Sequence, residues 1–146
     1  MIAVDTNILV YAHRADSAWH AAADRVVADL AEGTGSWAIP WPCLYEFYAI
    51  VTHPRIYAPP TPPADAVVQI ECWLESPTVV LLHEGAGFWD GLRPLLAGAR
   101  VQAAAVHDAR IAALCVRHGV KTLLSADRDF SRFRELRTQN PLRQPS

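Results

Sequence analysis

The opening residues decide the fold, and they read MIAVDTNILVYA from Met1 to Ala12. The apolar run up to Val4 ends on the carboxylate of Asp5, and a helix-compatible run follows at once. This pattern indicates a buried strand that delivers Asp5 to the edge of a sheet. In open α/β sheets, ligands bind in the crevice outside the carboxyl ends of the strands. Asp5 is therefore a candidate site residue, and other isolated acids in the chain are its candidate partners.

The rest of the chain alternates between expected helices and short expected strands. A first long helix can be capped by Asp16 or Ser17 and stops at Gly33. Further helices are expected at about 43–51, 61–74, 88–98 and 107–118, and strands at 36–39, 78–82 and 121–124, with a short edge strand near Leu136. This alternation predicts the α/β class, with a parallel or mostly parallel sheet of four to five strands and helices on both faces.

Three stretches are not expected to form regular elements. Residues 54–63 hold five prolines and predict a stiff loop, whereas residues 99–106 are small and predict a mobile one. The tail is expected to fray from Pro141 to Ser146. Each flank of the proline-rich loop is too short to be an independent domain, so we expect a single domain over residues 1–146.

Composition restricts the class of protein. The chain has 146 residues, of which 51% are hydrophobic and 19% charged, which is typical of a globular protein with a real core. It contains neither an apolar run of about 18 residues nor a secretory leader pattern, so we expect a cytoplasmic protein with no membrane contact. Cys43, Cys72 and Cys115 form no CxxC pair and are interpreted as reduced core residues.

Three further acids stand out as candidates for a site with Asp5. Glu46 is the only charge in a helix that is apolar on nearly all sides, where a carboxylate is costly unless it is paired, protonated or bound to a cation. Asp108 opens the 107–118 helix on the face of Ile111, which indicates an inward direction. Asp127 follows the strand at 121–124, as Asp5 follows the first strand.

Taken singly, each acid has a simpler explanation as a helix cap, a favourable charge at a helix N-terminus or part of an Asx turn. Taken together they pose an electrostatic problem if they converge. Two carboxylates about 5 Å apart repel by roughly 3 kcal/mol, and several such pairs exceed what a marginally stable domain tolerates. A hard cation with oxygen ligands, Mg²⁺ or Mn²⁺, relieves this repulsion while the acids stay ionised. No Cys/His cluster suggests zinc.

The same residues carry a resemblance to a known family. The run Val4-Asp5-Thr6-Asn7, Glu46 in its apolar helix, Asp108 opening a helix, and SADRDF at 125–130 resemble the PIN-domain ribonucleases. More narrowly they resemble the VapC toxins of toxin–antitoxin pairs. The segments FYAIVTHPRIY at 47–57 and RTQNPL at 137–142 are similar to a VapC subgroup abundant in mycobacteria. The resemblance covers essentially the whole chain.

The resemblance implies a three-layer α/β/α sandwich and an endoribonuclease that depends on Mg²⁺ or Mn²⁺ and hydrolyses RNA with a metal-activated water. It also implies the toxin of a type II toxin–antitoxin system, whose VapB-type antitoxin blocks the acidic pocket with its C-terminal segment. A homodimer, and a heterotetramer or larger assembly with the antitoxin, are further implications.

The resemblance also suggests roles for residues. Asp5, Glu46, Asp108 and Asp127 match the acidic quartet of the family, Thr6, Asn7 and Ser125 match its polar support, and Asp129 matches a frequent accessory acid. We expect Asp5 and Asp108 to bind the metal most directly, with Asp127 bound directly or through water. Glu46 is expected to orient or deprotonate the attacking water.

Two departures from the family pattern concern substrate positioning. His107 stands where relatives often have a small hydroxyl residue, and the loop at 103–105 lacks the polar residues common there. His107 is interpreted as structural or incidental, because a metal mechanism does not require a histidine.

The basic residues offer candidate contacts to RNA. The chain has twelve arginines and a single lysine, and arginine makes bidentate contacts with phosphate. Arg128, Arg132 and Arg134 in the tail are therefore candidate contacts to RNA phosphates. The formal net charge of −2 argues against binding of nucleic acid by bulk electrostatics alone.

Two other functions remain open from the sequence. His107-Asp108 could be the core of an HD-type metal phosphohydrolase, although that fold is all-helical and needs further histidine ligands that His83 and His118 do not supply convincingly. Alternatively, the acids could form a non-catalytic pocket that only docks a basic or metal-bearing partner.

Overall fold

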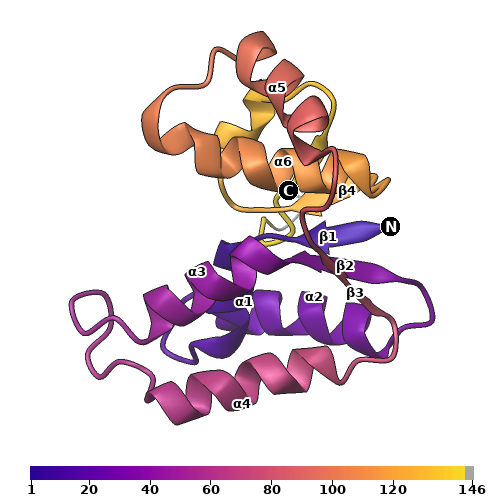
Figure 1. Ribbon diagram of the computed structural model, residues 1–146. Coiled ribbons are helices and arrows are strands. Elements are labelled where there is room, and N and C mark those ends of the chain that lie inside the picture. The colour runs from indigo at the N-terminus through magenta and orange to yellow at the C-terminus, as the bar shows by residue number, and fades with distance from the viewer. Residues whose placement is uncertain (144–146) are drawn as a thin grey trace.

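A five-stranded sheet lies between two layers of helices in the computed structural model, which describes residues 1–143 (Figure 1). The strands are β1 (Ile2–Val4), β2 (Trp37–Pro40), β3 (Val79–Leu82), β4 (Thr122–Leu124) and β5 (Arg137–Gln139). Their order is β3-β2-β1-β4-β5, and every neighbouring pair is parallel. The expected α/β/α sandwich and the edge strand near Leu136 are confirmed.

Helices cover both faces of the sheet. Helices α1 (Thr6–His13), α2 (His20–Glu32), α3 (Trp41–Val51) and α4 (Pro63–Leu74) lie on one face, and α5 (Phe88–Gly98) and α6 (Val106–Arg117) lie on the other (Figure 1). Two short 3₁₀ helices complete the structure, η1 (Ala103–Ala105) and η2 (Arg128–Arg132). Among the described residues, no helix has the length and apolar character that crossing a membrane requires.

The expected cap of the first long helix was wrong. Helix α2 begins at His20 with Trp19 at its N-cap position, where no side chain caps it. Asp16 instead pairs with Arg14, at 2.6 Å, and the Ser17 hydroxyl accepts a hydrogen bond from the Trp19 amide. Both residues therefore stabilise the turn before the helix.

Two segments that we expected to be irregular are more ordered than predicted. The 99–106 stretch contains η1 directly before α6, with Ala103 at a φ of 52° where the turn begins. In the tail, Leu142 is only 4% exposed, and its amide donates to Asn140 Oδ1. The prediction of fraying from Pro141 is therefore wrong up to Arg143, and its last part, residues 144–146, lies outside the described chain.

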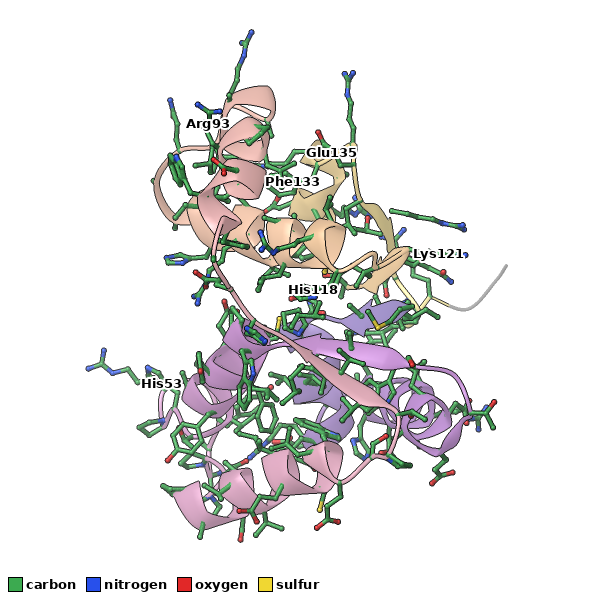
Figure 2. All side chains as sticks on the ribbon, turned by 45° about the vertical axis from the view of Figure 1, so that its right-hand side comes forward. His53, Arg93, His118, Lys121, Phe133 and Glu135 are labelled. Carbon is green, nitrogen blue, oxygen red and sulfur yellow. The ribbon has the colours of Figure 1, made fainter. Side chains whose placement is uncertain are left out.

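The core occupies both spaces between the sheet and its helices, which side chains fill (Figure 2). The central strands are buried on both faces, so Ala3, Val4 and the run Trp37–Ile39 are fully buried. Phe47 of α3 packs edge-on against Trp73 of α4 and His13 of α1. This packing fixes α3, and with it the position of Glu46.

The cysteines are all free, as expected, but they do not share one environment. Cys43 and Cys115 are buried, whereas Cys72 is exposed on α4. The prediction of a core position is thus confirmed for two of them and wrong for the third, which lies on the solvent side of an amphipathic helix.

The strand order places a crevice between β1 and β4. The chain passes from β1 to β2 and β3 in one direction and returns to place β4 on the other side of β1. Such a switch point is where ligands bind in open parallel sheets. Val4 pairs with Leu124 in the register, and the Asp5 amide donates to the Leu124 carbonyl over 2.9 Å. The residues that follow the two strands therefore lie side by side.

We expect Ser76→Ala to destabilise the fold. Ser76 Oγ accepts from Trp37 Nε1 and donates to the Ala31 carbonyl, both over 3.0 Å, and so joins β2, α2 and the approach to β3. The substitution leaves the N–H of the buried Trp37 indole without a partner, which costs about 1–3 kcal/mol of unfolding free energy in urea denaturation. Ser36→Ala, at an exposed position, is the control. An equal loss in both variants would contradict this role of Ser76.

Candidate active site

Asp5 forms the base of the candidate site. Its carboxylate is 4% exposed and accepts hydrogen bonds on both oxygens. Oδ1 accepts from the Thr6 amide over 2.8 Å and from Cys43 Sγ over 3.6 Å. Oδ2 accepts from Ser125 Oγ over 2.7 Å and from Asn7 Nδ2 over 3.4 Å. Donors from α1, α3 and the end of β4 thus converge on one carboxylate.

Burial dominates the electrostatics of Asp5. It raises the pKa of this carboxyl to about 6, because the charged form loses its hydration. The hydrogen bonds from Ser125 and Thr6 oppose the rise in pKa, and the negative charge of Glu46 adds to it. The negative charge of Glu46, on α3, therefore acts directly on the Asp5 carboxyl, which follows β1.

Glu46 reaches the site from α3, which begins directly after β2 ends at Pro40. Thr6 Oγ1 donates to Glu46 Oε2 over 3.1 Å. Cys43 lies three residues before Glu46 on the same helix, so both face the site. Thr6 therefore links the two acids, with its amide bound to Asp5 and its hydroxyl bound to Glu46.

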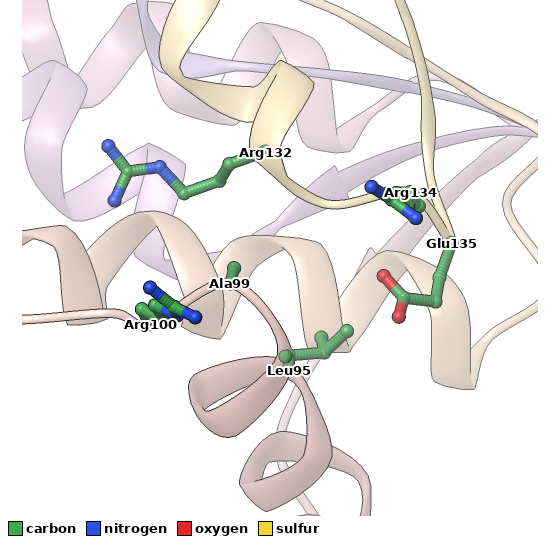
Figure 3. A pocket seen from close by; sticks show the side chains of 7 residues that line it. Leu95, Ala99, Arg100, Arg132, Arg134 and Glu135 are labelled. Atoms are coloured by element: carbon green, nitrogen blue, oxygen red, sulfur yellow. The ribbon is translucent and has the colours of Figure 1, made fainter.

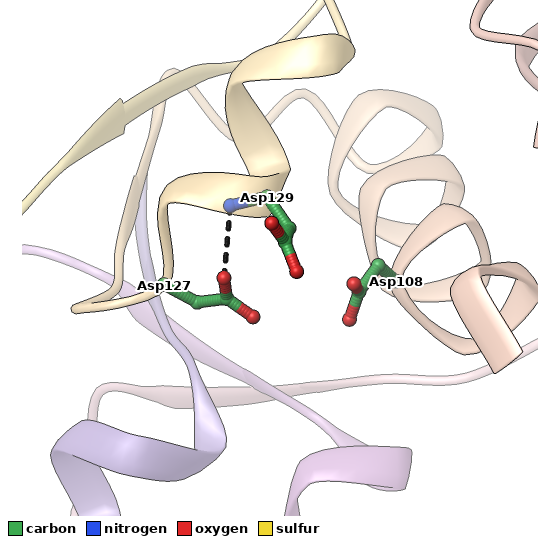
Figure 4. A group of neighbouring side chains, drawn as sticks. All are labelled: Asp108, Asp127 and Asp129. Atoms are coloured by element: carbon green, nitrogen blue, oxygen red, sulfur yellow. Dashed lines mark hydrogen bonds between the residues drawn. The ribbon is translucent and has the colours of Figure 1, made fainter.

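A chain of hydrogen bonds leads from Asp5 to the rim of the site. Ser125 Oγ, which donates to Asp5, accepts from the Asp127 amide over 2.9 Å. Asp127 Oδ1 then accepts from the Asp129 amide over 2.8 Å, at the start of η2 (Figure 4). Asn7 Oδ1 accepts from the Ala126 amide over 3.1 Å, which ties the same segment to α1.

Three acids share one space at this rim. Asp108, Asp127 and Asp129 each offer a carboxylate oxygen, and these atoms lie within 4.8 Å of one another (Figure 4). Burial raises the pKa of Asp108, and so do the charges of Asp127, Asp129 and Glu46, in that order, while Arg132 opposes them. The charge of Glu46 thus raises the pKa of both Asp5 and Asp108, so these acids are electrostatically coupled.

The donor set fits a hard divalent cation. All three rim groups offer carboxylate oxygens, and the oxygens lie within 4.8 Å of one another, near enough for one cation to contact several of them. The buried Cys43 thiol is unsuited to bind a metal, because burial and the charge of Asp5 raise its pKa well above the usual value and keep it protonated. The donor set is therefore that of a hard divalent cation.

The structure brings the predicted acids together but groups them differently. Asp5, Glu46, Asp108 and Asp127 surround one site, with Thr6, Asn7 and Ser125 in hydrogen-bonding contact. The oxygens that share one space come from Asp108, Asp127 and Asp129, whereas Asp5 lies below them among its donors. Direct binding of the metal by Asp5 stays a prediction.

The sequence did not indicate that Cys43 contacts the site, and it assigned no role in the site to His107. The Cys43 thiol donates to Asp5, although we assigned Cys43 to the core alone. Its spacing of three residues from Glu46 on one helix was the available signal. His107 is exposed in the first turn of α6, beside Asp108.

Comparison with known proteins identifies the class. The PIN-domain family model matches residues 2–136. Ribonuclease VapC43 of Mycobacterium tuberculosis is 37% identical over 142 residues, which cover 97% of this chain and 96% of that relative. Ribonuclease VapC48 of the same organism is 33% identical over 137 residues, 94% of each chain.

Solved structures show the same fold. The crystal structure of VapC20 of Mycobacterium tuberculosis, described as a sarcin-ricin loop cleaving toxin, has a TM-score of 0.67 and 22% identity, and covers 94% of this chain and 99% of that one. VapBC2 from Rickettsia felis, bound to a DNA fragment from its promoter, has a TM-score of 0.67 and 20% identity, over 96% and 98% of the two chains.

Fold and acidic site together are those of a PIN domain, and the parallel sheet excludes the all-helical HD-type phosphohydrolase. The chain belongs to the PIN-domain family and, within it, to the VapC ribonucleases.

We expect Asp5→Asn to reduce the pH dependence of stability when metal is chelated with EDTA. The pKa of Asp5 is raised in the folded state, so its contribution to stability is complete below about pH 4 and is lost as the pH rises through about 6. Between about pH 4 and 7 the wild type should lose about 1–3 kcal/mol relative to the variant, as measured by urea denaturation.

Asp24→Asn is the matched control for this experiment, because it removes an exposed carboxylate from α2. It should follow the wild type across the pH range. If Asp5→Asn also follows the wild type, then Asp5 carries no unfavourable charge in the folded protein.

Proposed function

We propose that this chain is the toxin of a type II toxin–antitoxin pair, and that it cleaves RNA as an endoribonuclease dependent on Mg²⁺ or Mn²⁺. The observation that carries the proposal is that acids from distant parts of the chain converge on one site. They include Asp5, Glu46, Asp108 and Asp127, and the atoms that they offer to a metal are all carboxylate oxygens. The names of the relatives, ribonucleases VapC43 and VapC48, support RNA as the substrate.

In this proposal, Asp108, Asp127 and Asp129 hold the cation at the rim, and Asp5 adds its charge from below. When bound, the cation neutralises a phosphate oxygen and lowers the pKa of a bound water. Glu46 orients the attacking water and accepts its proton on a carboxylate oxygen. Thr6 Oγ1 fixes Oε2 of that carboxylate, and Ser125 holds Asp5.

The proposal includes a protein partner. A VapB-type antitoxin would cover the acidic pocket with its C-terminal segment, in a complex in which the toxin is a homodimer and the assembly a heterotetramer or larger. One structural neighbour, VapBC2 from Rickettsia felis bound to a DNA fragment from its promoter, is a toxin–antitoxin complex. On this chain, α3 exposes Tyr45 and Tyr48 beside Trp41, close to Glu46, and offers a partner an apolar surface.

RNA cleavage tests the activity. With Mn²⁺ the wild type should cut RNA, EDTA should abolish the activity, and Asp108→Asn should lower the rate by about 100-fold or more, because it removes a charge that holds the cation. Gel analysis of labelled RNA measures the rate, and Asp24→Asn should retain it. Metal-independent cutting that is equal in wild type and Asp108→Asn would exclude the nuclease and leave a non-catalytic acidic pocket.

Metal binding tests the division of roles among the acids. Asp108→Asn and Asp129→Asn should each weaken Mn²⁺ binding by more than about tenfold in titration calorimetry, since each removes a charged ligand at the rim. Glu46→Gln is the control and should bind Mn²⁺ nearly as the wild type does, because Glu46 acts on water. Normal Mn²⁺ binding by Asp129→Asn would mean that Asp129 is not a metal ligand and that Asp5 takes that place.

A further inference from the structure

A second pocket, with a volume of about 470 Å³, lies between the end of α5 and the segment that follows η2 (Figure 3). Arg100, Arg132 and Arg134 line it, together with the buried Leu95 and the exposed Glu135. Figure 3 shows these three arginine side chains around the pocket, with Glu135 at one edge. Three arginines and a single carboxylate thus line the pocket.

These arginines form no ion pair within the described residues 1–143. In the part of the chain that the structure describes, the ion pairs are Arg14 with Asp16 and Arg110 with Glu84, and neither includes a residue of this pocket. A planar guanidinium matches the oxygens of a phosphate with two parallel hydrogen bonds. A group of such side chains without carboxylate partners is suited to bind a phosphate.

The way α5 ends determines the position of Arg100. The end of α5 is a Schellman motif, in which the Val101 amide donates to the Leu96 carbonyl over 3.0 Å and the Arg100 amide donates to the Ala97 carbonyl over 3.4 Å. Arg100 occupies the left-handed position of this motif, with φ of 51°, where glycine is usual. The motif therefore fixes the point at which Arg100 leaves the end of α5.

The pocket adjoins the acidic site. Arg132 lies three residues after Asp129 in η2, and its positive charge opposes the rise in the pKa of Asp108. Phe130 and Phe133, each 1% exposed, anchor η2 in the core. The segment that carries Asp129 toward the rim therefore also carries Arg132 toward the pocket.

We propose that Arg100, Arg132 and Arg134 form a phosphate clamp, which holds a backbone phosphate of the RNA strand beside the acidic site. The inference rests on the proposed function, because it takes the strand to be cut as the ligand. An acidic peptide is a different class of ligand, and its binding is an alternative outcome of the test below.

The clamp differs from the set of basic residues suggested by the sequence. Arg132 and Arg134 belong to it, but Arg128 lines a separate pocket with Arg143, beside Ser125 and Asp127. Arg100 takes the third position, although it comes from a distant segment of the chain, at the end of α5.

The test is RNA binding in EDTA, where no cation supports cleavage. The probe is a fluorescein-labelled, single-stranded RNA of mixed sequence, and fluorescence anisotropy reports its dissociation constant. The triple substitution Arg100→Gln, Arg132→Gln and Arg134→Gln should weaken binding by about tenfold or more. It should also reduce the slope of log affinity against log salt by about 0.7, as expected when one phosphate of a single strand is no longer neutralised.

A control variant matched in charge carries Arg25→Gln, Arg55→Gln and Lys121→Gln, three exposed positions on α2, on the proline-rich loop and before β4. It should bind within about threefold of the wild type. An equal loss in both triple variants would overturn the clamp in favour of bulk charge. Tighter binding of a poly-glutamate peptide than of RNA, lost in the clamp variant, would overturn it in favour of a protein partner.

Glu135→Gln provides a test in the opposite direction. Removal of the one carboxylate of the pocket should tighten RNA binding by about two- to threefold, which misfolding cannot mimic. Unchanged or weaker binding would contradict the clamp.

Failure of the clamp and failure of the proposed function are distinguishable. If the wild type cuts RNA with Mn²⁺ while the clamp variant binds and cuts normally, only the clamp is wrong. If the wild type never cuts RNA but the clamp variant loses binding, the proposed function is wrong and the clamp stands. If both are right, the clamp variant should raise KM more than it lowers kcat, because it removes contacts remote from the reacting bond.

Discussion

The buried carboxylate of Asp5 is the constraint on which the rest of the site depends. An acid that is 4% exposed loses most of its hydration, and it is tolerated because Thr6, Cys43, Ser125 and Asn7 all donate to it. These donors come from both ends of the chain, so they meet only when β1 and β4 pair in the observed register. The alignment of two central strands thus sets the position of Asp5 relative to the segment that carries Ser125 and Asp127.

Charge is arranged in two zones around this base. Acids gather where the strands end, and arginines gather one short helix away, with Arg132 between the zones and Arg100 at their outer edge. A chain with a net charge of −2 does not attract nucleic acid by its overall field. Local separation of charge lets the same face hold a cation at one point and an anion at another. This arrangement suits a phosphodiester, which must be held on one side and polarised on the other.

Much of the fold follows from local patterns in the sequence, and the finer geometry of the site does not. Apolar runs that end on Asp5 or precede Asp127 identify strands, and a lone Glu46 in an apolar helix marks a site, because both depend only on near neighbours. The cap of α2 was missed because Asp16 has a stronger partner in Arg14. The grouping of Asp129 with Asp108 depends on the turn of η2, and the place of Arg100 depends on how α5 ends. No local sequence pattern predicts the grouping of these acids or the place of this arginine.

The order of the segments along the chain affects the timing of the chemistry. The segments up to α6 supply Asp5, Glu46 and Asp108, whereas β4, Ser125 and Asp127 leave the ribosome after all of them. Until these later residues emerge, Asp5 lacks its shortest hydrogen bond and the rim lacks two of its three acids. The complete site, with its three rim acids and the hydrogen bond from Ser125 to Asp5, therefore exists only once β4 has joined the sheet. In the proposed function, the last segments of the chain to be made are the ones that complete the ribonuclease.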